Sequence, residues 1–357
     1  MTDLHHFYNT RRNEFATKCE ELKGTMRKIS LLRIGVAILF LGVIYLGFAE
    51  SLYWYGTLPL AVIFAFLVSR HGKVQDQYQL KLTLVTLNDY EIAALGNDYS
   101  SFNDGQKFSD PNHAYSYDLD LFGKGSLFQF LNRCGTAIGE ARLAADLRKP
   151  QPVVDSILDR QKAVEELTNK AELRQWFWAQ GHLLHDDPHE NENLFSWLGE
   201  ENVLLDKPIF KALLVIFPAI SAFLVALTIY DTVYFPLLFV FGGVQWLVIS
   251  FKSKEVSRAE SILFHYRKLL EKYASLLRGI GNEDFSSSRL KDIQLDSAHA
   301  SERIRKFSQL VNAFESRKNA IASMFGNSLY LYDLQCLYKL EKWRAANHTS
   351  VENWLDK

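Results

Sequence analysis

The residues that come closest to a chemical site in this chain form a short glycine-rich segment, FGKGS, at positions 122–126. A phosphate-binding loop follows the pattern GxxxxGK[ST], in which backbone amides and a lysine hold the phosphates of a nucleotide. Here a glycine follows Lys124 where Ser or Thr is required, and Asp118 stands five residues before Gly123, where the first glycine belongs. We therefore interpret the segment as a turn, with Ser126 capping the helix that follows.

A group of imidazole and carboxylate side chains in the middle of the chain could hold a metal ion, because such groups are common metal ligands. Its members are His182, His185, Asp186, Asp187, His189 and Glu190. The same stretch is polar and acidic throughout, which is typical of a solvent-exposed loop, and we favour that interpretation. We therefore assign no metal ligand.

Two remaining patterns also have a simpler explanation. Asp118 and Asp120 could form an acid–base pair, but no histidine or metal motif accompanies them, so turn and capping roles are favoured. The aromatic residues Trp176, Phe177 and Trp178 could stack on bases, although such clusters more often pack in a core or an interface. The sequence contains no GxSxG or HExxH motif. We assign no catalytic residue and no cofactor-binding residue.

The overall composition limits the class of protein. The chain has 357 residues and a formal net charge of -1. Its mean hydropathy of -0.09 indicates that most of it is water-soluble. A balanced charge gives no general attraction to nucleic acid, because phosphate binding needs clustered Lys and Arg. Cys19, Cys134 and Cys336 are too widely spaced for a metal pair or a disulfide framework, which favours a reducing, cytoplasm-facing location.

Two apolar stretches are the strongest structural signal in the sequence. One covers residues 34–69 with a turn at 49–51, and the other covers residues 212–251 with a turn at 230–232. A helix needs about 20 residues to span ~30 Å of hydrocarbon, and each half of each stretch is close to that length and free of charge. Hairpins buried in a soluble core are the alternative, but four such runs paired by tight turns favour two transmembrane hairpins.

The charges beside these stretches predict an orientation. The two tight turns carry Glu50 and Asp231 and no Lys or Arg, whereas the outer flanks are basic, so both termini and the middle region should be cytoplasmic. The basic flanking residues are Arg27, Lys28, Arg33, Arg70, Lys73, Lys207, Lys211, Lys252, Lys254 and Arg258. Because residues 1–30 are charged and amphipathic, the first apolar run is expected to be an uncleaved anchor. The uncharged spans disfavour a channel or pump.

The soluble parts show helical periodicity and no convincing strand pattern, so the predicted class is all-α. We expect an amphipathic helix over residues 1–30, a hairpin over 31–70, a first core segment over 71–207, a second hairpin over 208–252 and returning helices over 253–357. Residues 126–147 are expected to be helical, Asp155 to cap a helix, and a single final helix to carry the apolar positions 329–343.

One segment of the chain resembles the core, or lever, domain of the MutS family. The similarity rests on YDLDLFGKGSLFQFLNR at 117–133, GTAIG at 135–139, RLAADLRKP at 142–150 and ILDRQKAVEEL at 157–167. Upstream, NDYEI at 88–92 and FNDG at 102–105 are similar to the lead-in of membrane-associated, MutS-related bacterial proteins. Cys134 departs from the Thr that the family often has there.

The resemblance implies a helical lever region. In a complete protein, this region would work with an ATPase domain that uses ATP and Mg²⁺. The resemblance also implies DNA mismatch repair as the family's activity. The first hairpin stands where the mismatch-reading domain would be, and the second where levers extend toward the DNA clamp. No Walker segment follows the last helix, so the chain is either the N-terminal portion of a longer protein or has lost ATPase function. We expect the first, because the helix that ends near residues 354–357 has no clear terminal signal.

These observations define the expected partners and one alternative function. The lipid bilayer is the predicted partner, in a bacterial inner membrane with four transmembrane helices, and a homodimer is possible. DNA is implied by resemblance but has no support from charge. The alternative is a membrane-anchored scaffolding protein without nucleotide or DNA chemistry.

Overall fold

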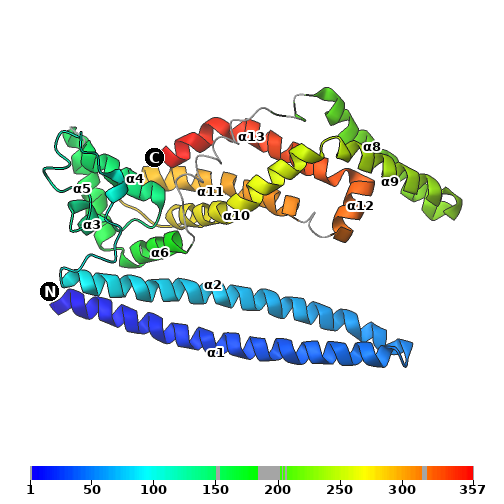
Figure 1. The fold of residues 1–357 in the computed structure, drawn as a ribbon, viewed down its shortest axis with the longest axis horizontal. Helices are drawn as coiled ribbons and strands as arrows, with labels where there is room; N and C mark the ends of the chain where they lie inside the picture. Colours follow the sequence, from blue (N-terminus) through cyan, green and yellow to red (C-terminus); the bar gives the residue numbers. More distant parts are fainter. Residues whose placement is uncertain are drawn as a thin grey trace. The chain divides into compact units, whose positions relative to one another are not determined.

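The computed structural model describes residues 2–149, 153–183, 202, 204–205, 207–315 and 320–356. Within those ranges the chain is helical and contains no strand, which confirms the all-α prediction. Figure 1 shows the helices of the chain, which divides into two compact units. The first consists of Met1–Val153 with Asn169–His185, and the second of Val154–Thr168 with Asp186–Lys357.

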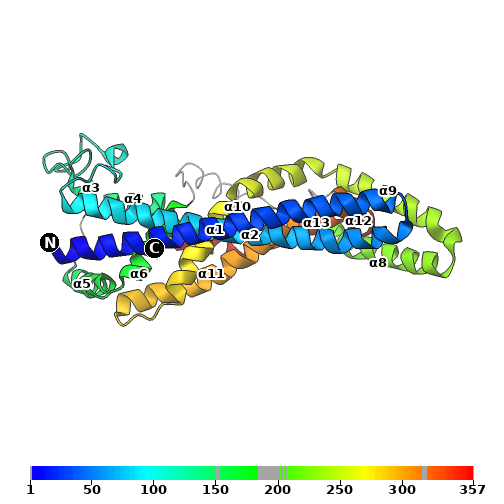
Figure 2. The ribbon, with the colours of Figure 1, turned by 90° about the horizontal axis from the view of Figure 1, so that it is seen from below.

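The first unit is built on a long helical hairpin. Helix α1 (Thr2–Gly47) runs antiparallel to α2 (Thr57–Leu95), with the short 3-10 helix η1 (Ser51–Gly56) at the turn (Figure 2). The expected amphipathic helix over residues 1–30 and the first apolar run form one helix, because α1 continues between them without a break. The junction offers no reason to stop, because residues 27–33 lack Gly and Pro and are mostly good helix formers.

The rest of the first unit lies at the polar end of this hairpin, where α6 packs against α2. It contains η2 (Gln106–Phe108), α3 (Leu127–Leu131), α4 (Ala137–Arg148) and α6 (Ala171–His182). The expected helix over 126–147 is therefore two helices, because Thr136 begins α4 anew by accepting the Gly139 N–H with its side chain. The buried core at this end is formed by Phe15, Leu84, Leu87, Trp178 and Ala179.

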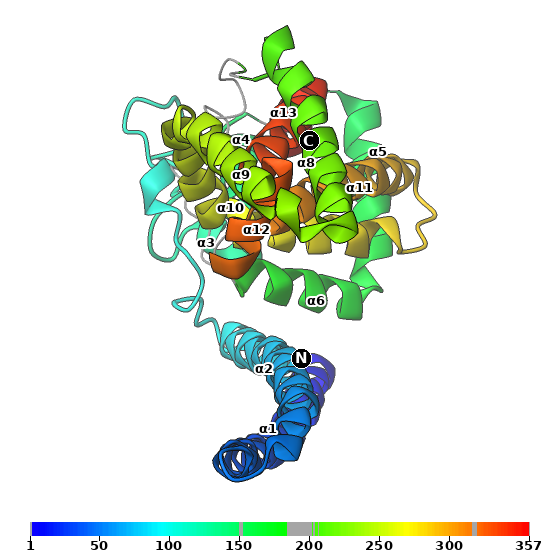
Figure 3. The same cartoon turned by 90° about the vertical axis from the view of Figure 1, so that its right-hand side faces the viewer.

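The second unit combines an apolar hairpin with long amphipathic helices. The hairpin is α8 (Pro208–Tyr230), η3 (Thr232–Tyr234) and α9 (Phe235–Ser250). The remaining helices are α5 (Val154–Thr168), α10 (Ser253–Gly281), α11 (Ser288–Glu315), α12 (Ala320–Tyr330) and α13 (Tyr332–Asp356). Large side chains such as Phe307, Phe314 and Leu334 form its core. Figure 3 shows α12 beside α8 and α9.

Two local expectations in this unit are corrected. Helix α5 begins at Val154, so Asp155 lies in its first turn, where a negative charge favours the helix dipole, and is not the cap. The expected single helix through 329–343 is broken at Leu331, whose φ of 51° lies in the left-handed region. The apolar periodicity cannot reveal this break, because Leu331 is fully buried and therefore fits the apolar pattern although the helix breaks there.

Four helices are long and apolar enough to cross a membrane by length and composition: Asp3–Gly47, Thr57–Leu95, Pro208–Tyr230 and Thr232–Ser250. Only 6% to 17% of their apolar windows is buried within the protein. Large apolar side chains such as Phe48, Tyr230 and Phe239 are mostly exposed. Such extensive apolar exposure is unfavourable in water and favourable in hydrocarbon. The four predicted spans therefore exist as helices with outward-facing apolar surfaces.

Candidate functional site: the junctions between apolar hairpins and helical core

The glycine-rich segment at 122–126 does not fit a phosphate or a nucleotide. The Gly123 N–H donates to the Asp104 carbonyl oxygen at 2.8 Å, and the Gly125 N–H donates to Gln129 Oε1 at 2.7 Å. Ser126 Oγ accepts the Gln129 N–H at 3.2 Å as the cap of α3, as the sequence predicted. The amides that would hold phosphate are thus used within the loop, and we derive no chemistry through a nucleotide here.

The other sequence candidates occupy structural positions where they are described. His182 stacks on Trp178 at the end of α6, with ring centroids 3.8 Å apart, whereas residues 185–190 lie outside the described part. Trp178 is buried in the core, in edge contact with Tyr90. Asp118 is exposed, and Asp120 adopts a left-handed turn conformation with φ of 47°. The described residues contain no group of three His, Cys, Asp or Glu able to hold a metal.

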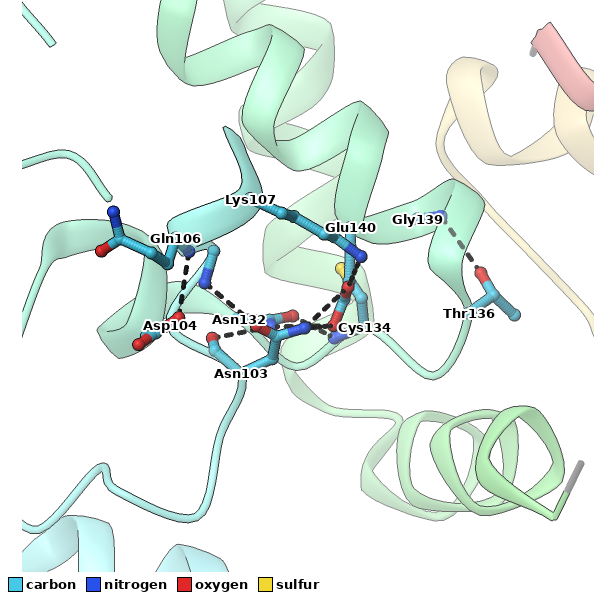
Figure 4. A network of polar contacts seen from close by, with 10 residues as sticks. Asn103, Asp104, Gln106, Lys107, Asn132, Cys134, Thr136, Gly139 and Glu140 are labelled. Carbon is cyan, nitrogen blue, oxygen red and sulfur yellow. Dashed lines mark hydrogen bonds and ion pairs between the residues drawn. The ribbon is translucent and has the colours of Figure 1, made fainter. Parts of the chain in front are cut away.

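A polar network holds the 103–107 loop on the start of α4 (Figure 4). Glu140 accepts hydrogen bonds from Asn103 Nδ2 at 2.9 Å and from Lys107 Nζ at 3.0 Å. Asn132 Nδ2 donates to the Asn103 carbonyl oxygen at 3.2 Å, while its Oδ1 accepts the Cys134 N–H at 3.0 Å. Burial, with a contribution from the Glu140 charge, raises the pKa of the Cys134 thiol to about 11. The thiol is therefore protonated at neutral pH and a poor nucleophile.

The first junction is a buried relay that joins α6 to the base of the α1/α2 hairpin. Arg11 Nε donates to Gln175 Oε1 at 2.7 Å, and Gln175 Nε2 donates to Asn88 Oδ1 at 3.0 Å. Asn88 is fully buried and completes the relay by donating to the Leu84 carbonyl oxygen at 2.7 Å. Because each amide depends on its neighbour, sliding α6 along the hairpin would leave buried polar groups unpaired.

Two further contacts fix the same junction. Arg133 binds the Glu91 carboxylate on α2 with two nitrogens, at 2.6 and 3.2 Å, and its guanidinium lies 3.6 Å from the Phe102 ring centre. Gly135 lies so close to α6 that a Cβ there would come within 2.9 Å of the Trp178 carbonyl oxygen. The facing residue, Gly181, has even less room, because a Cβ there would lie still closer to the Gly135 carbonyl oxygen. The Arg133–Glu91 ion pair and the close packing of Gly135 on α6 therefore both hold the connection at residues 132–136 in place.

The second junction lies where the α8/α9 hairpin meets the break between α12 and α13. The fully buried Gln245 donates from Nε2 to Ser221 Oγ at 2.7 Å and to the Ser328 carbonyl oxygen at 2.8 Å. Its Oε1 accepts the N–H of Leu331, the left-handed residue, at 3.2 Å. Trp246 Nε1 also donates to Ser328 Oγ, at 3.0 Å. One glutamine of the apolar hairpin thus satisfies the backbone of the helix break.

A carboxylate stabilises each of two other connections in the second unit. Glu341 on α13 accepts the N–H groups of Leu204 and Leu205, both at 2.8 Å, which fixes the chain just before α8. Glu166 on α5 accepts the N–H groups of Ser286 and Ser287 at 2.7 and 2.8 Å, at the start of α11. The Ser287 and Ser286 backbone hydrogen bonds lower the pKa of Glu166 to about 2.

Sequence reasoning missed the residues of both junctions. Asn88 and Gln175 lie within amphipathic helices, where polar residues are ordinarily read as surface positions. A signal was available for the second junction, because Ser221 and Gln245 are polar residues inside runs that are otherwise apolar. In a hydrocarbon environment, such residues need a partner within the protein.

These features define an all-helical protein whose polar contacts join apolar, membrane-length hairpins to a helical core. Residues 111–186 match the family model for MutS domain III, so this segment is a MutS-related core segment, as the resemblance indicated. It includes α3, α4, α5 and α6, and so contributes Gln175 to the first junction and Glu166 to the capping contact. No curated protein and no solved structure matched the chain.

Proposed function

We propose that this chain is the lever region of a MutS-related membrane protein, and that it transmits conformational change between the helical core and the bilayer. The observation that carries the proposal is the Arg11–Gln175–Asn88 relay. Gln175 lies in the MutS-related segment, whereas Arg11 and Asn88 lie on helices that continue into apolar spans. Movement of one part would therefore be passed to the other or would break buried hydrogen bonds.

An ATPase domain would supply the driving force, as the resemblance implies. In a protein that carries such a domain together with this chain, ATP and Mg²⁺ would act there and the levers would transmit the movement. Within the described residues, our proposal concerns only mechanical roles: the relay couples α6 to the first hairpin, and Gln245 couples the second hairpin to α12 and α13.

The bilayer, rather than DNA, is the partner that the residues favour. The family resemblance implies binding to mismatched DNA, but the net charge of -1 gives the chain no general attraction to a polyanion. Several basic side chains are also paired with carboxylates, among them Arg12 with Asp89 and Arg133 with Glu91. Counterion release from DNA needs several unpaired cations along one surface. The alternative function, a membrane scaffold without nucleotide or DNA chemistry, shares the bilayer but requires no coupled movement.

Two measurements on the full chain test the proposal. In liposomes, the chain should float with the lipid after alkaline extraction, and release into the soluble fraction would contradict membrane anchoring. The backbone amides of α6 and of residues 84–95 should then exchange their hydrogens at similar rates. In a Gln175→Leu variant, α6 should exchange faster while the chain still floats. Unchanged exchange in that variant would favour the scaffold. Binding of duplex DNA with steep salt dependence would contradict our choice of partner.

A further inference from the structure

Helix α12 has an apolar surface that the second unit leaves open. Its sequence, AIASMFGNSLY, contains no charged residue. Met324 and Phe325 are 51% and 57% exposed, and Tyr330 at its end is 43% exposed. At 11 residues the helix is too short to cross a membrane. Its composition is nevertheless closer to that of the apolar hairpins than to that of α10 or α11.

The same helix packs directly on the apolar hairpin. Ser328 receives hydrogen bonds from both Gln245 and Trp246 of α9, at 2.8 and 3.0 Å. One turn earlier in α9, a Cβ added to Gly242 would lie 3.3 Å from the Ser328 Cβ. The end of α12 is therefore fixed to the side of α9, at the level of residues 242–246.

The spacing of flanking charges sets the depth of this contact. Lys252 follows Gln245 by seven residues, which corresponds to about 10 Å along a helix, and Lys211 precedes Ser221 by ten residues, or about 15 Å. If both lysines lie in the headgroup region, the Gln245–Ser221 hydrogen bond lies well inside the ~15 Å half-thickness of the hydrocarbon. Because Ser328 shares the same glutamine, α12 is at that depth too.

The break after α12 is also built as a membrane would require. Irregular backbone at hydrocarbon depth is tolerated only where protein groups satisfy its amides and carbonyls. At this break, Gln245 accepts the Leu331 N–H, and the buried Asn327 accepts the Asp333 N–H at 2.9 Å. Leu331 is fully buried, so both N–H groups at this break are satisfied by protein side chains rather than by water.

We propose that α12 is a third membrane-embedded element, which enters one leaflet beside α8 and α9 and places Met324 and Phe325 against lipid acyl chains. The chain then turns at Leu331 and returns toward water as α13. This inference rests on the proposed bilayer insertion of α8 and α9. It adds a lipid contact at the point where the levers meet the hairpin.

The test uses the full chain in liposomes of phosphatidylethanolamine and phosphatidylglycerol. A polarity-sensitive fluorophore is attached to single introduced cysteines, M324C or F325C, and quenching by doxyl-labelled phospholipid is measured. F239C, on the exposed face of α9, is the membrane control, and L295C, exposed on α11, is the aqueous control. The unsubstituted chain gives the background, which should be low because Cys19 and Cys336 are buried and the raised pKa of the partly buried Cys134 keeps its thiol protonated.

Each outcome separates this inference from the proposed function. We expect quenching at positions 324 and 325 to be within about twofold of that at 239 and several-fold above that at 295. Quenching at 239 alone would overturn the inference and leave the hairpin in the membrane. A blue-shifted but unquenched label at 324 and 325 would mean protein cover, which also overturns it. Absence of quenching at 239 would overturn bilayer insertion of α8 and α9 itself.

Discussion

At the residue scale, single positions within and just before the MutS-related segment at 111–186 have roles that their chemistry can explain. Gly105 illustrates this, because its backbone has φ of 68° and the Phe128 ring occupies the place of a side chain. Glu166 lies within the ILDRQKAVEEL segment used for the resemblance, and its carboxylate caps α11. The sequence showed that these residues belong to a recognisable pattern, but their partners are distant in the chain and could not be read from it.

Replacing Gly105 with Ala should destabilise the first unit by on the order of 2–3 kcal/mol, from backbone strain and loss of packing. A Cβ at this position would lie 2.5 Å from Phe128 Cδ1. Thermal unfolding of the full chain in detergent, followed by circular dichroism, measures the effect. Gly24→Ala is the matched control, because it lies in α1 with open space around it and should be neutral or slightly stabilising. Equal melting temperatures for the two variants would contradict the strain argument.

Glu166 should make stability depend on pH in the acidic range. Its pKa is lowered from 4.5 to about 2 in the folded chain, so the capping contact stabilises the fold fully above pH 4.5. That contribution is lost as the pH falls from 4.5 through 2, where the folded-state carboxylate takes up its proton. The difference in melting temperature between the wild-type chain and Glu166→Gln should therefore be largest near pH 7 and should shrink as the pH falls to 3. Glu165→Gln, one residue away, should melt in parallel with the wild type, and a constant gap for Glu166→Gln would refute the assignment.

At the element scale, the helices were predictable but the places where they break or continue were less so. The tight turns at 49–51 and 230–232 follow from polar residues between apolar runs, and the structure confirms them. The break at Leu331 could not be predicted, because it depends on hydrogen bonds that backbone N–H groups donate to Gln245 and Asn327 rather than on Gly or Pro. Helix α1 continued past its expected end because charged residues with good helix propensity do not stop a helix.

Replacing Gln245 with Leu should weaken the contact between the hairpin and the α12–α13 break. The Leu331 N–H and the Ser328 carbonyl would lose their shared partner, at a cost of about 1–3 kcal/mol for each buried group left unpaired. Amide hydrogen exchange at residues 328–333 should therefore become faster. Val244→Ala, at a partly exposed neighbouring position, should leave that exchange unchanged. Unaltered exchange in Gln245→Leu would show that the break is held by apolar packing alone.

At the scale of the whole molecule, the sequence predicted the class and the two hairpins, and the family match extends over 111–186. Division into two compact units was not predicted, since α5 joins the second unit while α3, α4 and α6, its neighbours in sequence, belong to the first. The reason is that Glu166 binds the start of α11, more than a hundred residues later. Such pairings depend on tertiary structure, which periodicity does not encode.

The predicted orientation can be tested on whole cells that express the chain. Cysteines introduced at Glu50 and Asp231, in the two tight turns, should react with a membrane-impermeant maleimide from the outer face of the inner membrane, because positive charge is retained on the cytoplasmic side. L295C should react only after the membrane is permeabilised. Labelling of L295C in sealed cells, with both turns protected, would invert the proposed topology.

The unbroken length of α1 also has a mechanical consequence. Its 46 residues correspond to about 69 Å, of which roughly 30 Å would cross hydrocarbon, leaving about 39 Å outside the bilayer. Helices commonly change tilt to match the thickness of the surrounding lipid. A change in tilt of about 10° would swing the free end of this rod sideways by roughly 7 Å, more than one helical turn. In a chain built this way, a change in membrane thickness would become a sideways displacement of the N-terminal end of α1.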